Sequence, residues 1–211
     1  MRLIRGFLFF VATLLIFSAL PGYAADLSAV IATLEQDYNA LSDVQAAFSQ
    51  KTTIASIKRE ERGKGELFIK KGSGAEAMFR FDYEKPRQQI VSDGKQVWYY
   101  LPDNKQVMVS DVKALFAGGN GMALNYLTGL GHVSRDFKIS FAKEGQDRKG
   151  NYVLDLVPKK PNQVMTRLRL TIAAQAVEQF RESGKPLALF PVIESAMDDP
   201  YGNRTVIEFS R

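Results

Sequence analysis

Six short apolar segments follow one another between residues 44 and 110, and only a few residues separate the last five from one another. The separating residues are turn formers, such as Asp93-Gly94 and Pro102-Asp103-Asn104. Strands joined by such short turns must pair antiparallel, because a parallel pair needs a crossover of a dozen residues or more. The spacing therefore predicts a meandering antiparallel sheet. Its expected strands span residues 44–53, 65–71, 78–83, 88–92, 95–101 and 106–110.

Helices are expected on either side of this sheet. Residues 26–41 carry one apolar stripe at helical spacing, and Asp26 or Ser28 can cap its start. Two short apolar helices are expected near residues 112–116 and 122–127, with glycines at their ends. Strands resume at 137–141, 152–158, 165–172, 190–196 and 205–209, with a possible short helix at 173–180. The pattern predicts a mainly β protein with helices.

The N-terminus has the pattern of a secretory signal peptide. Arg2 and Arg5 precede an apolar run over residues 7–20, and Ala24 ends a small-residue cleavage site. We expect residues 1–24 to be cleaved and residues 25–211 to form one domain; an uncleaved anchor is the alternative. The chain has no cysteine, so it lacks the residue that a bacterial lipoprotein signal requires. Export to the periplasm without lipidation is therefore expected.

Residues for common chemistry are scarce. His132 is the only histidine, which leaves a His-dependent triad or an ordinary zinc site without its parts. Asp198-Asp199 stands directly before Pro200 and predicts a structural turn rather than a calcium loop. A carboxylate-pair hydrolase stays open, since two acids can meet only in the fold. The net charge of +5 falls to +3 without the signal peptide and gives no nucleic-acid footprint. We expect no enzyme, no metal and no cofactor.

Residues 97–101 read Val-Trp-Tyr-Tyr-Leu and are apolar on both faces of a strand. A two-residue turn at Asp93-Gly94 would place Gln89 opposite Trp98, whereas a three-residue loop would place Ile90 there. The second register groups the apolar side chains and is preferred. The many aromatic residues between 44 and 141 form either a plain core or a cup with a movable cover, which would suit an acyl chain.

Several of these segments resemble the outer-membrane lipoprotein carrier (LolA) family. The most specific is Ile90-Val91-Ser92-Asp93-Gly94-Lys95 with the following Trp-Tyr-Tyr and Pro102. Others agree in order and spacing, and together they cover most of the chain after residue 24. They are Phe48-Ser49-Gln50, residues 65–71 and 79–83, Leu127-Thr128-Gly129, residues 152–159 and Gly202-Asn203-Arg204-Thr205.

The resemblance implies an unclosed antiparallel β-barrel, or half-barrel, with a leading helix and short helices covering its concave apolar face. Lys71 stands where the family carries an arginine that latches the cover, and Lys70 is the alternative latch. Trp98 and Tyr100 are expected to face the cavity, with Tyr99 packed or outside. The expected acyl-chain cavity is lined by Phe48, Leu67, Ile69, Phe79, Phe81, Ile90, Trp98 and Tyr100. The expected lid residues are Leu115, Phe116, Met122, Leu124 and Leu127.

The resemblance also implies a function. Such a carrier accepts acylated lipoproteins from an ABC-type release complex in the inner membrane and hands them to an outer-membrane receptor. We expect a periplasmic monomer with no nucleic-acid partner. Two alternatives stay open: a carrier of another lipid or glycolipid, and a half-barrel sensor or partner-binding domain.

Overall fold

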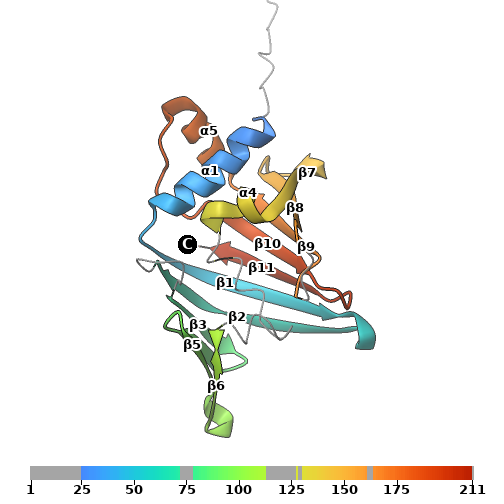
Figure 1. Cartoon of the computed structure of the whole chain (residues 1–211). Coiled ribbons are helices and arrows are strands. Elements are labelled where there is room, and N and C mark those ends of the chain that lie inside the picture. Colours follow the sequence, from blue (N-terminus) through green and yellow to red (C-terminus); the bar gives the residue numbers. More distant parts are fainter. Residues whose placement is uncertain (1–24, 72–77, 113–126, 128–129, 161–163, 211) are drawn as a thin grey trace, which may run out of the picture.

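The computed structural model describes residues 25–71, 78–112, 127, 130–160 and 164–210. The expected signal peptide and lid residues Leu115, Phe116, Met122 and Leu124 lie outside these ranges, as do the two short helices expected there except for Val112 and Leu127. The described chain forms one sheet of eleven antiparallel strands with a few helices (Figure 1). The predicted fold class, a mainly β half-barrel, is confirmed.

The sheet is assembled from two consecutive halves. The first contains β1 (Asp43–Ile54), β2 (Arg59–Lys70), β3 (Met78–Lys85), β4 (Gln88–Ser92), β5 (Gln96–Leu101) and β6 (Gln106–Asp111). The second contains β7 (Phe137–Gln146), β8 (Tyr152–Pro158), β9 (Arg167–Ile172), β10 (Val192–Asp198) and β11 (Arg204–Ser210). The strand order is β6-β5-β4-β3-β2-β1-β11-β10-β9-β8-β7, so β1 and β11 join the halves. Strands β6 and β7 stand at the two ends, and the barrel is unclosed.

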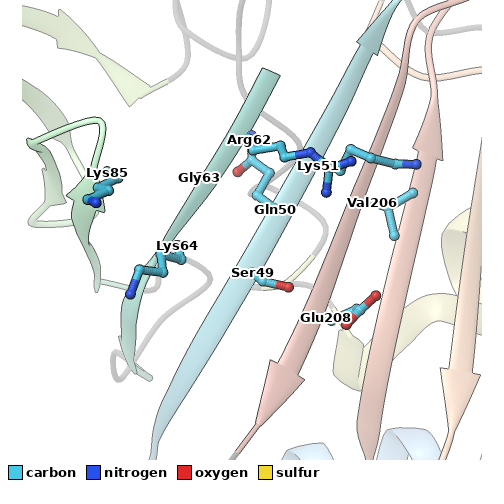
Figure 2. A pocket seen from close by; sticks show the side chains of 9 residues that line it. All are labelled: Ser49, Gln50, Lys51, Arg62, Gly63, Lys64, Lys85, Val206 and Glu208. Carbon is cyan, nitrogen blue, oxygen red and sulfur yellow. The ribbon is translucent and has the colours of Figure 1, made fainter. Parts of the chain in front are cut away.

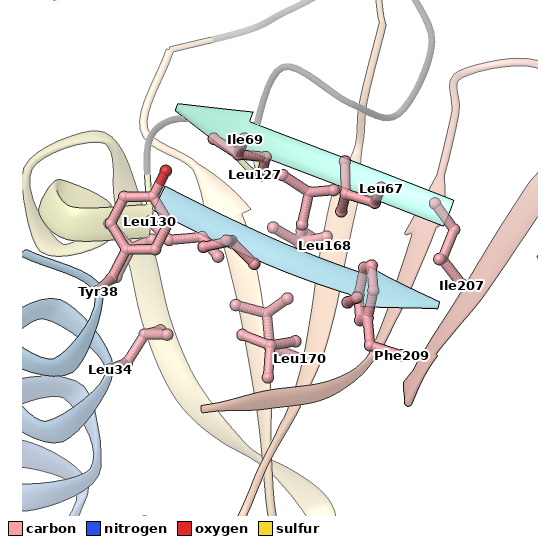
Figure 3. Close-up of a cluster of buried hydrophobic side chains, with 14 of the residues drawn as sticks. Leu34, Tyr38, Leu67, Ile69, Leu127, Leu130, Leu168, Leu170, Ile207 and Phe209 are labelled. Carbon is pink, nitrogen blue, oxygen red and sulfur yellow. The ribbon is translucent and has the colours of Figure 1, made fainter. Parts of the chain in front are cut away.

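The leading helix α1 (Leu27–Ala40) begins where the sequence predicts. The carboxylate of Asp26 accepts the N–H of Ala29 at 2.8 Å, which satisfies a backbone donor of the first turn. Val30, Leu34 and Tyr38 are buried along one face. This stripe packs against the sheet, and Leu34 and Tyr38 point toward the side chains of the strands in Figure 3.

The other helices lie close to α1. A 3-10 turn, η3 (Leu130–His132), runs into the short α4 (Val133–Asp136), and α5 (Ala174–Ser183) ends at Gly184 with a positive φ of 65°. All three contact α1. Figure 1 shows α1, α4 and α5 gathered at one end of the molecule, with the β5–β6 hairpin at the other. The helix considered possible at residues 173–180 is therefore present as α5.

Two turns bear on the predictions. Asp199 accepts the backbone N–H groups of Tyr201 and Asn203, each at 2.8 Å, so the expected structural turn at Asp198-Asp199 is confirmed. Asp93 accepts the N–H groups of Lys95 and Gln96, also at 2.8 Å. These bonds hold a loop of four residues between Ser92 and Val97, which pair directly. Both registers considered for this hairpin are therefore wrong, because each assumed a shorter loop.

Candidate functional site: the concave apolar face

The strand register builds one apolar row across the concave face. Leu67 stands opposite Phe81, Phe81 opposite Ile90, Ile90 opposite Tyr99, and Tyr99 opposite Met108. Residues directly opposite in neighbouring antiparallel strands share one face of the sheet. The row therefore crosses five strands, from β2 to β6, without a charged side chain.

Aromatic rings fill the centre of this face. Phe48 on β1 meets Phe81 edge-on with 5.5 Å between ring centroids, and Tyr83 with 4.9 Å. Phe79 meets Phe81 at 6.1 Å. The hydroxyl of Tyr83 donates to Gln50 Oε1 at 2.8 Å, and burial raises the pKa of this tyrosine. Edge-to-face pairs add about 0.5–1.5 kcal/mol each beyond the area they bury, so the cluster is packed and not fluid.

The structure brings six of the eight predicted cavity residues together on this face. They share burial as well as orientation, since all belong to the continuous core of the molecule. The six are Phe48, Leu67, Ile69, Phe79, Phe81 and Ile90. Their grouping is an observation of geometry; that they hold acyl chains is still a prediction.

Trp98 and Tyr100 do not belong to this group, and the prediction that they face the cavity is corrected. Trp98 stands opposite Val91 and Tyr100 opposite Gln89, so both lie on the convex face. Tyr99 lies on the concave face instead, half-buried, with its hydroxyl bonded to Gln88 Oε1. The physical reason is the four-residue loop, because the side-chain period of a strand is two and a one-residue change in loop length turns every following side chain over.

Further concave residues were missed by the sequence reasoning. Val44 and Ala46 alternate with Phe48 along β1, and Tyr83 follows Phe81 at the same period on β3. All are buried. The period-two alternation from already selected residues was the signal that could have found them. Val97 is buried on β5 and was missed with Tyr99 through the wrong register.

Helix α1 covers part of the concave face, and Lys71 holds its C-terminal end. The ammonium of Lys71 donates to the carbonyl oxygen of Tyr38 at 2.6 Å and lies 4.7 Å from the centre of the Tyr38 ring. Partial burial lowers the pKa of Lys71. The predicted latch residue therefore contacts a helix carbonyl. Its relation to the predicted lid residues other than Leu127 lies outside the described residues.

The segment after Leu127 is fastened to the same helix. Asn39 Nδ2 donates to the carbonyl oxygen of Gly131 at 2.9 Å, and Glu35 accepts the N–H of Ser134 at 2.8 Å. A Cβ at Gly131 would lie 2.1 Å from Asn39 Oδ1, so this approach requires glycine or a moved Asn39. Leu127 and Leu130 are buried in the core shown in Figure 3.

A buried carboxylate lies on α1 as well. Asp37 Oδ1 accepts the N–H of Leu187 at 2.6 Å, which ties the segment between α5 and β10 to the helix. Asp37 Oδ2 and the Tyr38 hydroxyl are buried side-chain oxygens that have no hydrogen-bond partner among the described residues. Burial raises the pKa of Asp37, and it raises that of Tyr38 to about 12.

Open grooves flank the aromatic cluster, and one of about 470 Å³ on the concave face is lined by Gln50, Tyr83 and Tyr99 among others. One of about 450 Å³ is lined largely by polar and charged side chains from β1, β2 and β11, among them Lys51, Arg62 and Glu208 (Figure 2). Arg62 is paired with Glu60 at 3.0 Å, which reduces the positive charge there. Another, of about 470 Å³, runs past Leu41 and Phe190. The aromatic centre of the concave face, by contrast, is filled by its own side chains.

The described part of the chain holds neither a membrane-spanning helix nor a cluster of metal ligands. No helix in it is both long enough and apolar enough to cross a membrane. Among the same residues, no three histidine, aspartate or glutamate side chains gather as metal ligands would.

An open antiparallel half-barrel, with an apolar concave face under a leading helix, defines the class of this protein. The family model described as outer membrane lipoprotein carrier protein LolA matches residues 39–183. The chain belongs to this family.

Relatives of the chain carry the same description. An outer-membrane lipoprotein carrier protein of Pseudomonas paraeruginosa is 31% identical over 212 aligned positions, which cover 99% of this chain and 87% of that protein. A protein of the same description from Xanthomonas oryzae is 33% identical over 172 positions, which cover 81% of this chain and 71% of that protein. A solved LolA superfamily protein from Nitrosomonas europaea has a TM-score of 0.40 and 13% identity, with 85% and 90% of the chains covered. The structure of MucB in complex with MucA(peri) has a TM-score of 0.43 and 15% sequence identity. The match covers 88% of this chain and 54% of that one.

Proposed function

We propose that this protein is a periplasmic carrier that shields the acyl chains of lipoproteins between the inner and the outer membrane. The observation that carries the proposal is the uncharged row from Leu67 to Met108 on the concave face. Family membership and the names of the relatives support it. The release complex that loads the carrier and the receptor that unloads it are the partners this function requires.

The energetics favour a site that is closed when empty. Burying one sixteen-carbon chain is worth about 12 kcal/mol gross, at about 0.8 kcal/mol per CH₂. A permanently open pocket that captured this value would not release its cargo. Here the centre of the concave face is packed, so an entering acyl chain must displace protein contacts. The net binding free energy is reduced by the free energy of the contacts that are lost.

Helix α1 is the candidate for the part that yields. Its described polar ties to other elements are few, and they lie on one stretch of the helix. They involve Glu35, Asp37, the Tyr38 carbonyl and Asn39. Hydrogen bonds contribute about 0.5–1.5 kcal/mol each and up to about 3 kcal/mol where a charge takes part. The apolar contacts of Val30, Leu34 and Tyr38 with the sheet add to the free energy that holds the helix. A bound acyl chain can replace these contacts because it covers the same apolar surface of the sheet.

Native mass spectrometry tests the proposal. The exported chain, beginning at Ala25, is mixed with detergent-released triacylated lipoprotein or with the same polypeptide without acyl groups. A one-to-one complex with the acylated form alone supports the carrier. Free lipid retained without any lipoprotein complex would move the function to another lipid cargo, and a stable protein partner without lipid would move it to a sensor.

Neighbouring tyrosines provide a matched pair of variants. Tyr99→Glu places a charge on the concave face and is expected to weaken the acylated complex at least about tenfold, because an acyl chain cannot solvate a carboxylate. Tyr100→Glu makes the same change on the convex face and is expected to leave the complex intact. Equal effects of the two variants would contradict the concave site.

A further inference from the structure

The two terminal strands of the sheet are built differently. β7 carries Lys138 and Lys143, and its pairing with β8 shifts register between Phe141 and Gln146. Lysines and register irregularities are the devices that keep an edge strand from pairing with another chain. β6 has no lysine and no proline, and its pairing with β5 is regular. The β6 edge therefore lacks these two devices, which the β7 edge has.

The centre of β6 is apolar and exposed on both faces. Val107, Met108 and Val109 are 54%, 54% and 56% exposed. Val107 stands opposite Tyr100 and Val109 opposite Trp98, so these four residues continue one apolar surface on the convex face. Within the described ranges, β5 is the one strand that pairs with β6. In the absence of a partner, the apolar side chains of β6 are exposed to water. A strand that pairs with β6 would bury part of this apolar surface, which is favourable.

The backbone of β6 offers hydrogen bonds toward the open edge. Val112 N donates to the carbonyl oxygen of Lys95 at 2.8 Å, so these two residues form a hydrogen-bonded pair. Such pairs alternate with non-bonded pairs along an antiparallel ladder. Val107 and Val109 therefore direct their N–H and C=O groups away from β5.

We propose that the β6 edge pairs antiparallel with the β6 edge of a second copy of this chain, with Met108 opposite Met108. This register places Val107 opposite Val109 and Gln106 opposite Ser110. It also places Lys105, the residue before β6, across from Asp111 of the other copy, so that two such pairs form, one on each side of the twofold axis. Val107 and Val109 then form hydrogen-bonded pairs, as their outward backbone groups require, and Met108 forms the non-bonded pair at the axis.

Neighbouring registers are less favourable. An axis at Val107 sets Asp103 across from Asp111, a repulsive pair, and an axis at Val109 sets Val107 across from Asp111. The charges and the apolar residues of β6 thus select one symmetric alignment. Each strand is only six residues long, so the interface is small. Interfaces below about 1,200 Å² are typically weak and transient, and the monomer expected from the sequence is then one side of an equilibrium.

Single cysteines test the register directly, because the chain has none of its own. In the proposed dimer the two copies of residue 108 have Cα atoms about 4.5 Å apart, within the range of a disulfide. Met108→Cys in the exported protein is expected to oxidise to a linked dimer at least about tenfold faster than Val107→Cys, whose own copy lies beyond about 7 Å. An equal mixture of Val107→Cys and Val109→Cys is expected to link faster than either variant alone, because only the mixed dimer sets the two cysteines opposite each other.

Charge reversal tests the choice of partner independently. Lys105→Asp and Asp111→Lys are each expected to weaken dimerisation about tenfold in sedimentation velocity, since two pairs per dimer turn from attraction to repulsion. The double variant is expected to restore it. A wild-type chain that stays monomeric at every concentration overturns the proposal. So does a dimer that neither reversal weakens, because another surface then holds it.

Discussion

The ammonium of Lys71 lies 2.6 Å from the carbonyl oxygen of Tyr38, and this oxygen also accepts the N–H of Leu41 at the end of α1. Lys71 itself directly follows β2, and its N–H donates to the carbonyl oxygen of Ser42 at 3.0 Å. A cation at the last turn of a helix opposes the negative end of the helix dipole. One lysine thus joins the sheet to the end of the helix that covers it.

Lys71→Met is expected to lower the free energy of unfolding by about 1.5–3 kcal/mol, the range for a hydrogen bond that involves a charge. Amide hydrogen exchange in the last turn of α1 is expected to quicken with it. Lys70→Met, one residue earlier and exposed, is the control and should change stability by less than about 0.5 kcal/mol. If urea unfolding showed the same decrease in the free energy of unfolding for both variants, the role of Lys71 would be contradicted.

Ile90 and Val91 are neighbours in β4 on opposite faces of the sheet. Ile90 is fully buried between Phe81 and Tyr99, whereas Val91 is half-buried on the convex face. Ile90→Ala is expected to destabilise the fold by about 2–5 kcal/mol through a cavity that the packed face cannot close. Val91→Ala is expected to cost less than about half as much in the same urea titration, and a reversed order would show that the concave face is the looser one.

Much of this architecture follows from local patterns. Period-two alternation and turn residues predict the meander of β1 to β6, and the apolar stripe with Asp26 predicts α1. The face of β5 does not follow from them, because the loop length depends on how Asp93 bonds to Lys95 and Gln96. A change of one residue there exchanges Tyr99 for Trp98 and Tyr100 on the concave side.

The contacts that hold α1 are still less predictable. The partner of Asp37 is the N–H of Leu187, 150 residues away, and no local spacing joins the two. Long-range hydrogen bonds of this kind depend on how the helices pack against the folded sheet. Lys71 could be proposed only through the family resemblance, since a lysine at the end of a strand is ordinarily a solvated residue.

The raised pKa of Asp37 makes stability depend on pH. A carboxyl whose folded pKa lies above its unfolded value of about 3.9 favours the fold when protonated. The stability that this group supplies is thus lost as the pH rises from about 4 through its raised folded pKa. Asp37→Asn keeps an acceptor for Leu187 N without the charge, and urea unfolding between pH 4 and pH 7 is expected to show a smaller loss in this variant than in the wild type. An unchanged slope would mean that Asp37 is solvated in the folded protein.

A pair of carboxyl groups on the convex face also makes stability fall as the pH rises. Glu194 and Glu208 stand directly opposite on β10 and β11, and burial together with the charge of Glu208 raises the pKa of Glu194. Like charges directly opposite in a sheet are destabilising, by about 0.2–1 kcal/mol. Glu208→Gln is therefore expected to stabilise the fold by about that amount at pH 7.

The same variant is expected to lower the pKa of Glu194 toward its ordinary value, which NMR titration of this carboxyl measures. Burial still raises it after the substitution, so a part of the shift is expected to remain. Glu178→Gln on the exposed face of α5 removes one negative charge that is not among those shifting the pKa of Glu194, and it serves as the control. If both variants moved the Glu194 titration equally, the net charge of the protein and not its cross-strand neighbour would govern this carboxyl.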